Sequence, residues 1–443
     1  MKTPVATVLL LTLALTGCSM TSTSPSSSSA SGVSFPLPTP VTGQVFNVRD
    51  FGAKADGKTK DTAALQKALD ACAAAGGGEV LVPAGNYLTG SLAISSRTTV
   101  RLAEGSTLTG SPDVADYPIV TARWEGEFRP SHRALLSAEK ASHVSIIGSG
   151  TLVGPPVALA SLRPRAAGTA RGPVMIEPAE CTDVLIEGIT VRYQRLWAVH
   201  PMLCERLVVR GVTIRSSMTN GDGLDLDSCK DVLIEKSDIE GGDDAISMKS
   251  GRGLSAVNLK RPTENVLIRN CTLHSIGFAA IGFGTEMSGG IRHIRVENST
   301  LSGNQNCIFI KSRDGRGGYM EDITGDHLIV KKSPTFIGID LVTKGIQASD
   351  PVTGVPDKWA HVAGIKFTHV QVEDVADLIL GKAISPERPI DGFVLSDITG
   401  TCAKGITLAN VEHAEFSDIK VTGYTGPLMN LTNVHGTGLE NPR

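Results

Sequence analysis

A short apolar motif that returns along most of the chain is the feature that most constrains the fold. The string DVLIEG at positions 183–188 returns as RLVVRG at 206–211, DVLIEK at 231–236 and NVLIRN at 265–270. Counted from Val184, successive copies lie 23, 25, 34, 28 and 29 residues apart, a period typical of solenoid repeats. Further copies begin near Val144, Ile294, Ile323, Ile365, Phe393 and Phe416. Each copy is rich in Val, Ile and Leu and therefore predicts one buried strand.

These repeats predict an all-β fold, a right-handed, single-stranded parallel β-helix of about ten coils, each of which adds one strand to every parallel sheet. Leucine-rich repeats, the competing solenoid, are not favoured because their Leu-x-x-Leu-x-Leu-x-x-Asn pattern is absent. The 48 glycines, against 11 Phe, 3 Trp and 5 Tyr, suit short strands and tight turns. Cys181, Cys204 and Cys229 each precede a repeat at the same distance, so we expect a stack of buried thiols rather than a disulfide.

One helix is predicted before the repeats. Asp61-Thr62 stands at its expected N-cap, and Gly76-Gly77-Gly78 ends it before a strand that begins at Glu79. Its apolar positions share one helical face: Leu65, Ala68, Leu69 and Cys72. We expect this helix to cap the N-terminal end of the β-helix.

The N-terminal segment predicts export. Residues 1–17 have the pattern of a signal peptide, with Lys2 before an apolar stretch too short to span a bilayer. Leu15-Thr16-Gly17-Cys18 resembles the lipobox of bacterial lipoproteins, in which the cysteine receives the lipid; an ordinary signal peptide is the alternative. Residues 18–43, rich in Ser and Thr, are predicted to be a flexible tether, and residues 44–443 form the β-helix domain. By the same resemblance, Ser19 in place of aspartate favours the outer membrane or cell surface of a Gram-negative bacterium.

Composition excludes several other classes. Lys and Arg number 42 and Asp and Glu 45, and this near balance gives no support to nucleic-acid binding. No apolar run reaches the roughly 18 residues of a membrane-spanning helix, so the lipid is the only membrane contact expected. The cysteines show no Cys-x-x-Cys spacing, so neither a zinc site nor a disulfide framework is predicted.

Two acidic clusters are the strongest signal for chemistry. One spans Asn220 to Asp227 and contains Asp222; the other is Gly241-Gly242-Asp243-Asp244. Their offsets from the repeat place Asp222 and Asp243 in similar parts of neighbouring coils, and the glycines allow an irregular backbone that turns both Asp243 and Asp244 toward one groove. Carboxyl groups held this close repel, so one keeps its proton, as hydrolysis of a glycosidic bond requires. Asx turns between coils and a calcium site are the alternatives.

The chain resembles glycoside hydrolase family 28, the polygalacturonases and related pectin-degrading enzymes, over nearly all of residues 44–443. The strings that carry the resemblance are FNVRDFGAKADG at 46–57, WAVHP at 197–201, EMSGG at 286–290 and KSRDGRGG at 311–318. By this resemblance Asp243 is the general acid, and Asp222 and Asp244 activate water in an inverting reaction. Asn220-Gly221-Asp222 keeps the family's Asn-Thr-Asp motif except for the threonine, and Gly242-Asp243-Asp244 keeps Gly-Asp-Asp intact. Asn220 is then a substrate-binding residue.

Two family motifs depart from the pattern. Phe278 stands where the family has the histidine of Gly-His-Gly, and Phe309 stands where it has the arginine of Arg-Ile-Lys, so that only Lys311 survives. The resemblance implies that the missing arginine helps to hold a galacturonate carboxylate; Lys249, Arg313 and Arg316 are the candidates to replace it. We expect Phe278 and Phe309 to line the same groove as the aspartates, where their rings would suit the C–H face of a sugar. Packing inside the coil is the alternative.

These observations predict a pectin-degrading glycosidase that binds a pectic polysaccharide or oligosaccharide, needs no cofactor or metal and acts as a monomer. The strings at 286–290 and 315–318 lean toward exo-acting relatives. A rhamnogalacturonan or substituted-galacturonan hydrolase, a catalytically impaired pectin-binding protein and a pectin lyase on the same fold are the alternatives.

Overall fold

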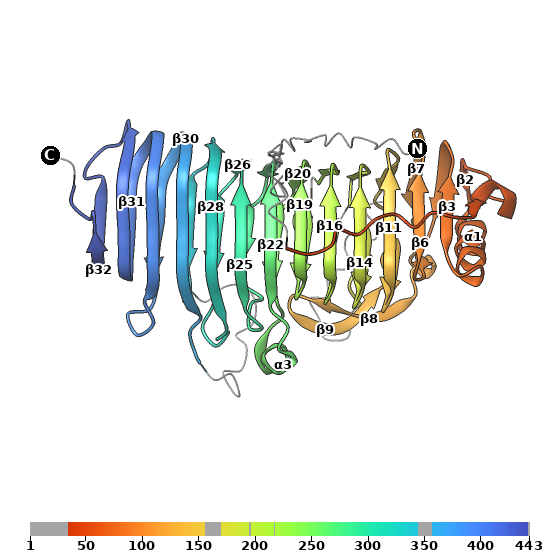
Figure 1. The fold of residues 1–443 in the computed structure, drawn as a ribbon, viewed down its shortest axis with the longest axis horizontal. Helices are drawn as coiled ribbons and strands as arrows, with labels where there is room; N and C mark the ends of the chain where they lie inside the picture. The colour runs from red at the N-terminus through yellow and green to blue at the C-terminus, as the bar shows by residue number, and fades with distance from the viewer. Residues whose placement is uncertain (1–33, 156–169, 195, 217, 344–356, 442–443) are drawn as a thin grey trace, which may run out of the picture. The chain divides into compact units, whose positions relative to one another are not determined.

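A computed structural model describes residues 34–155, 170–194, 196–216, 218–343 and 357–441. The predicted signal peptide and Cys18 lie outside these residues. Within the segment predicted as a tether, the Val41 carbonyl accepts a hydrogen bond of 2.9 Å from Thr99 Oγ1. From Val45 onward the strands stand side by side in chain order, as Figure 1 shows.

The strands form columns of parallel neighbours, and each coil contributes one strand to a column. The first column holds β1 (Val45–Asn47), β3 (Gly78–Val82), β6 (Thr98–Leu102), β11 (Ser142–Gly148), β14 (Thr182–Glu187), β16 (Glu205–Arg210), β19 (Lys230–Glu235), β22 (Thr263–Arg269), β25 (Ile291–Glu297), β28 (Tyr319–Lys331), β30 (His361–Ala383) and β31 (Ile390–Thr422). The second holds β2 (Asp56–Lys60), β4 (Gly85–Thr89), β7 (Ser106–Gly110), β12 (Thr151–Val153), β15 (Thr190–Arg192), β17 (Thr213–Arg215), β20 (Asp238–Gly241), β23 (Thr272–Ser275) and β26 (Thr300–Gly303).

The third column carries the candidate active site. A first group consists of β5 (Leu92–Ile94), β10 (Leu136–Glu139) and β13 (Ile176–Ala179). Isolated bridges from Ile176 to Val199 and from Val199 to Leu224 continue this column. It then passes through β18 (Leu224–Asp227), β21 (Ile246–Lys249), β24 (Ala279–Phe283), β27 (Asn306–Lys311) and β29 (Thr335–Asp340), and later through β30, β31 and β32 (Met429–Thr437).

The predicted repeat register is confirmed. Val184 stands opposite Leu207, which stands opposite Val232, and the series continues through Val266 and Ile294. The β-branched and leucine side chains of these strands are buried in one continuous core. The residue before each of them turns the chain in a left-handed conformation, which Asp and Asn tolerate better than most residues; Asp183 and Asp231 have φ of 56° and 58°. The sequence repeat therefore encodes both the strand and the turn that precedes it.

The cysteine stack also lies where the register places it. Cys181, Cys204 and Cys229 precede residues that are paired across three successive strands, and all three are free and buried. The thiols of Cys204 and Cys229 donate to the carbonyls of Pro178 and Pro201, each over 3.3 Å. Burial is the largest cause that raises the pKa of the Cys204 thiol. These cysteines are therefore core side chains with satisfied donors.

Helix α1 (Thr62–Ala74) covers the N-terminal end of the core, as predicted, and buries the four apolar residues of its predicted face. Its cap differs from the prediction. Asp61 occupies the N-cap position but makes no side-chain bond to the helix, because its carboxylate accepts from the backbone N–H groups of Lys54 and Ala55, at 2.6 and 2.9 Å. Asp61 thus fastens the loop before the helix. No helix in the described part of the chain is long and apolar enough to cross a membrane.

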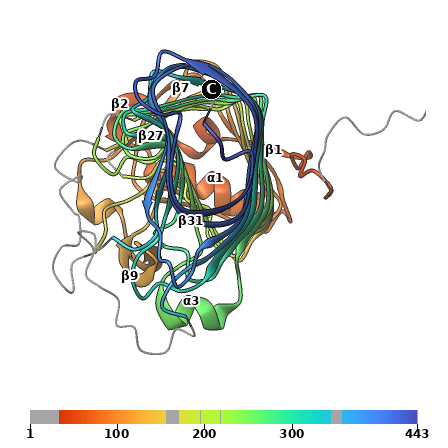
Figure 2. The same cartoon turned by 90° about the vertical axis from the view of Figure 1, so that its left-hand side faces the viewer.

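A hairpin outside the repeat was not predicted. Strands β8 (Ile119–Trp124) and β9 (Glu127–His132) pair antiparallel, unlike every other strand pair among the described residues. Viewed along the coil axis, β9 and the short helix α3 (Gly253–Leu259) lie at the periphery of the coils (Figure 2). The hairpin reaches along several coils, since its turn residue Gly126 accepts a hydrogen bond from the backbone N–H of Arg252. It covers an outer strand face that would otherwise meet solvent.

Candidate active site

All three predicted catalytic aspartates line one cavity of about 440 Å³. Asp222 lies just before β18, and Asp243 and Asp244 lie between β20 and β21, so they come from adjacent coils. The backbone joins these segments directly, because Gly223 N–H donates to the Asp244 carbonyl over 3.0 Å. The five predicted substrate-binding residues line the same cavity: Asn220, Lys249, Phe278, Phe309 and Lys311.

The backbone around Asp243 and Asp244 explains why both face the cavity. In a regular strand, adjacent side chains point to opposite faces. Here the chain bends, and Gly242 passes so close to the loop of the preceding coil that a Cβ on it would lie 2.1 Å from the Met218 carbonyl oxygen. Only glycine fits at that distance. The two glycines before the paired aspartates thus permit a bend that places both carboxyl groups on one wall.

The cavity favours protonated carboxyl groups. Burial, reinforced by repulsion from Asp244, raises the pKa of Asp243 from 3.8 to about 6, against the opposing effect of Lys311. Burial also raises the pKa of Asp222 well above its usual range, with repulsion from Asp225 as the next cause. Because these groups interact, their protons belong to the cluster as a whole. The cluster therefore holds at least one proton near neutral pH.

Two lysine ammonium groups neutralise the remaining charge. Lys311 Nζ lies 2.9 Å from Asp244 Oδ2. Lys249 is buried, and its Nζ lies 2.9 Å from Asp225 Oδ1, 3.6 Å from Asp222 Oδ2 and 4.0 Å from the centre of the Trp197 ring. This mixture of ammonium and carboxylate groups differs from the oxygen-only shell that calcium prefers. The arrangement therefore favours acid–base chemistry over a calcium site.

Asp225 belongs to this cluster, although sequence reasoning assigned it no role. It is completely buried, and this burial raises its pKa above the usual value despite the opposing effects of Lys249 and His200. The Leu-Asp-Leu-Asp pattern of β18 predicts that Asp225 and Asp227 share the outward face, which is ordinarily solvated. The sequence shows this alternation of β18, but it does not show the segment that packs over the outward face and buries it.

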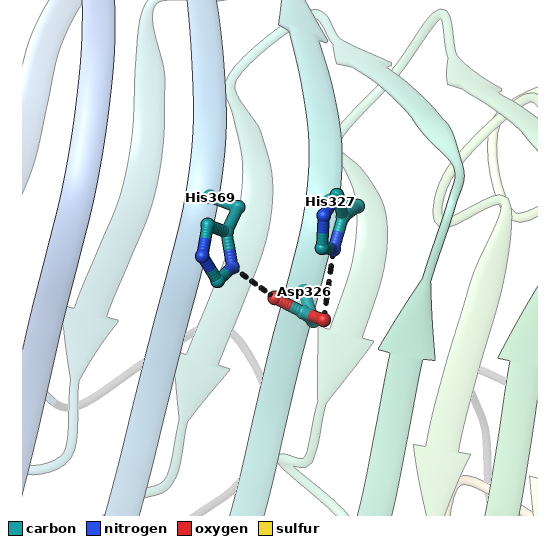
Figure 3. A group of neighbouring side chains, drawn as sticks. All are labelled: Asp326, His327 and His369. Atoms are coloured by element: carbon teal, nitrogen blue, oxygen red, sulfur yellow. Dashed lines mark hydrogen bonds and ion pairs between the residues drawn. The ribbon is translucent and has the colours of Figure 1, made fainter.

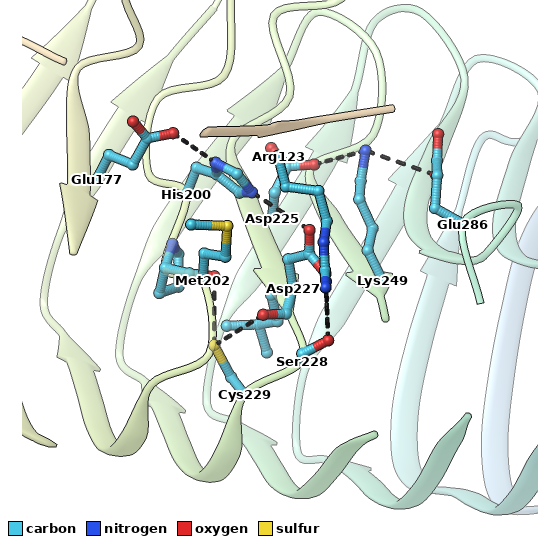
Figure 4. Close-up of polar contacts among 12 residues, drawn as sticks. Arg123, Glu177, His200, Met202, Asp225, Asp227, Ser228, Cys229, Lys249 and Glu286 are labelled. Carbon is cyan, nitrogen blue, oxygen red and sulfur yellow. Dashed lines mark hydrogen bonds and ion pairs between the residues drawn. The ribbon is translucent and has the colours of Figure 1, made fainter. Parts of the chain in front are cut away.

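Beneath the cavity, buried charges form a chain from the hairpin to the coils, shown in part in Figure 4. Arg123 Nη1 on β8 lies 2.5 Å from Asp227 Oδ1, and the opposite carboxylate oxygen lies 3.7 Å from His200 Nε2. His200 Nδ1 lies 2.8 Å from Glu177, which Arg171 contacts at 2.9 Å. Although burial lowers the pKa of His200, the two flanking carboxylates raise it above its usual value. The chain alternates in sign, as buried charges must in order to be tolerated.

Phe278 and Phe309 form part of the cavity wall. The rings of Phe278 and Phe309 meet edge to face with their centres 5.2 Å apart, and both side chains are half-buried. Lys311 Nζ lies 4.4 Å from the centre of the Phe278 ring and 5.5 Å from that of Phe309. Neither ring packs inside the coil. These two positions, where the family resemblance implied a histidine and an arginine, thus present an aromatic corner around one ammonium group.

Of the two arginines that were candidates to hold a substrate carboxylate, only one lines the cavity. Arg316 is buried, with 1% of its surface exposed, and does not line the cavity. Arg313 lines it, beside Thr343, whose carbonyl lies 3.4 Å from Nη1. Other cavity residues had no predicted role: Glu125 from the hairpin turn, Trp197 and Glu286. Trp197 and Glu286 stood in the strings that carried the family resemblance, whereas nothing in the sequence pointed to Glu125.

The chain is similar to known proteins over most of its length. The family model described as "Glycosyl hydrolases family 28" matches residues 72–398. A probable polygalacturonase from Vitis vinifera is 29% identical over 361 residues, which cover 79% of this chain and 73% of the relative. An exo-poly-alpha-D-galacturonosidase from Dickeya chrysanthemi is 27% identical over 63% of this chain and 54% of the relative.

Among solved structures, a hyperthermoactive exopolygalacturonase from Thermotoga maritima superposes with a TM-score of 0.71 at 24% identity, covering 90% of this chain and 93% of that one. This similarity confirms the right-handed parallel β-helix. The family model spans most of the described coils and both acidic clusters. The chain therefore belongs to glycosyl hydrolases family 28 and is a glycosidase.

Proposed function

We propose that this protein hydrolyses glycosidic bonds of a pectic chain with inversion at the anomeric carbon. The observation that carries the proposal is the convergence of Asp222, Asp243 and Asp244 in one cavity, with the pKa of Asp243 raised to about 6. The names of the similar relatives, a polygalacturonase and an exo-galacturonosidase, support the pectic substrate.

In the proposed reaction Asp243 donates its proton to the departing glycosidic oxygen, because its raised pKa keeps it protonated at mildly acidic pH. Asp244 accepts the proton of the attacking water, as an inverting reaction requires of a second carboxylate, and Asp222 helps to position that water. Lys311 holds Asp244 in position through their 2.9 Å ion pair. Asn220 lines the same cavity and is the candidate to contact a sugar hydroxyl.

Product analysis on a panel of pectic polymers tests this proposal. We expect saturated reducing ends whose first-formed anomer, seen by proton NMR, is inverted. Release of single terminal sugars from the first minutes would support exo-cleavage, and a ladder of oligomers would assign endo-cleavage. Unsaturated ends that absorb ultraviolet light would instead identify a lyase, and binding without products would identify an impaired pectin-binding protein.

We further propose that the aromatic corner formed by Phe278 and Phe309 shifts specificity away from plain polygalacturonate, toward a rhamnose-containing or substituted pectic chain. An aromatic ring suits the C–H face of a sugar, and it removes the bidentate partner that an arginine offers a carboxylate. The double variant Phe278→His/Phe309→Arg should raise kcat/KM on polygalacturonate relative to the wild type by about 10- to 100-fold, the value of one charge-assisted hydrogen bond. A wild type already efficient on polygalacturonate and unimproved by the change would contradict this proposal.

Export and anchoring are a separate proposal, which rests on the sequence of residues 1–18 alone. We propose that Cys18 carries the lipid and holds the protein at the outer membrane or cell surface, because a diacylated cysteine supplies the two chains that stable anchoring takes. Wild-type protein should sediment with membranes, and Cys18→Ser should release or mislocalise it. Recovery of the wild type entirely in the soluble fraction would refute the anchor.

A further inference from the structure

Two histidines and an aspartate converge on the C-terminal coils, on strands that contribute nothing to the catalytic cavity (Figure 3). Asp326 and His327 lie on β28, and His369 lies on β30, the next strand of the same column. His369 Nδ1 is 2.7 Å from Asp326 Oδ1, and His327 Nδ1 is 2.9 Å from Asp326 Oδ2. Each histidine thus faces one oxygen of the same carboxylate.

The turn at this position does not by itself require histidine. Asp326 pairs with Thr368, so His327 and His369 occupy the same turn in successive coils, both left-handed with φ of 51°. The two preceding coils place Asn270 and Asn298 there, with φ of 54° and 49°. Asparagine satisfies such a turn. Two consecutive histidines aimed at one carboxylate therefore go beyond what the backbone needs.

The three side chains are held in a common geometry. The histidine rings stack with their centres 4.6 Å apart and their planes 21° apart, and one potential ligand atom from each residue lies within 4.8 Å of the other two. Thr368 Oγ1 donates to Asp326 Oδ1 over 2.7 Å and so orients the carboxylate from behind.

We propose that Asp326, His327 and His369 form a binding site for a divalent transition-metal ion, with zinc as the probe. Two imidazole nitrogens and one carboxylate oxygen suit zinc, nickel or copper, whereas calcium and magnesium prefer oxygen ligands alone. The ion would replace the two contacts between the histidines and the carboxylate. Both histidines are more than half exposed, at 60% and 52%, so water can complete the coordination.

Such an ion would join two consecutive coils. Asp326 and His369 are 43 residues apart in the sequence, which is why no motif spacing pointed to them. The strands they occupy, β28 and β30, are paired along much of their length, and the ion would tie them at one turn. Because the unfolded chain does not hold the three ligands together, binding should stabilise the folded protein.

Zinc titration of the metal-stripped full-length protein tests the site. Isothermal titration calorimetry should show one zinc ion bound per chain. Thermal unfolding should show that zinc raises Tm, and cobalt substitution should give the absorption bands of a nitrogen-ligated ion. The variants His327→Asn and His369→Asn keep a residue that the turn accepts, and each should weaken zinc binding at least tenfold.

The matched control is His413→Asn. His413 also occupies a left-handed turn, with φ of 52°, and lies 2.6 Å from a carboxylate, that of Asp391, but this pair has only one histidine. This control should bind zinc as the wild type does. Failure of the wild type to bind, or undiminished binding by the double variant His327→Asn/His369→Asn, would overturn the proposal. Glycosidase activity on the best substrate should be unchanged in every variant, so this test stands apart from the proposed function.

Discussion

Replacing Asp243 with asparagine is expected to lower kcat by about 10²- to 10⁴-fold, the usual contribution of general acid catalysis, while KM and Tm change little. The amide has the same shape, but it cannot give a proton to the leaving oxygen. In the wild type, kcat/KM should fall as the pH rises through about 6, since the protonated fraction of Asp243 falls with it. Initial rates across pH on the best pectic substrate check both expectations.

The matched control for this variant is Asp238→Asn. Asp238 lies on β20, a few residues before Asp243, and its half-exposed carboxylate pairs with Arg215 rather than lining the cavity. This change should leave kcat within about twofold of the wild type, since exposed ion pairs contribute little. Asp243→Asn at the wild-type rate would assign the acid to another group, and an equal loss in both variants would indicate a structural effect.

The second large effect is expected on stability. Arg123→Met removes the arginine partner of Asp227 and leaves a carboxylate with 2% exposure whose remaining ion-pair partner among the described residues is His200. Breaking such a buried pair costs about 3–5 kcal/mol of unfolding free energy. The same substitution at Arg388, whose 2.9 Å pair with Asp357 is exposed, should cost less than about 1 kcal/mol. Denaturant unfolding measures both, and equal small losses would show that the buried pair is dispensable.

Neutralising the stranded charge provides a second check. Arg123→Met/Asp227→Asn should recover part of the lost stability, because the amide carries no uncompensated charge. Burial alone would raise the pKa of Asp227, but Arg123 and His200 bring it from 3.8 down to about 2. A carboxyl group whose pKa is lower in the folded state stabilises the protein at pH values above its unfolded-state pKa. That contribution is therefore complete above pH 4 and is lost as the pH falls toward 2.

The coils could be predicted because each repeat carries its own evidence. Val184 and its counterparts predict a strand, so the register follows from counting along the chain, and the left-handed residue before each of them, such as Asp183 or Asp231, makes the turn. The hairpin could not be predicted, since residues 119–132 lack the repeat and include Pro130. The predicted side-chain cap at Asp61 is wrong because its carboxylate accepts hydrogen bonds from two backbone N–H groups of the preceding loop.

The candidate site divides in the same way. Asp222, Asp243 and Asp244 stand in local motifs whose glycines reveal the bend, and the structure brings them together. The surroundings of three buried residues, Asp225, His200 and Arg123, depend on packing between the β8–β9 hairpin and coils that are distant in the sequence. Their chemistry depends on burial, and burial of an outward strand face is a tertiary property that local patterns do not carry.

The hairpin β8–β9 also has a consequence for how the molecule opens. In a solenoid each coil contacts only its neighbours, so unfolding can proceed one coil at a time. Here Arg123 is tied to Asp227, 104 residues further along the chain, and Gly126 is tied to Arg252. The coils between these anchors, which include both acidic clusters, should open as one cooperative unit, and the amides of β16 to β21 should share a single rate of opening in hydrogen exchange. The C-terminal coils lack this strap and should exchange faster, so opening at that end of the stack should not spread into the catalytic segment.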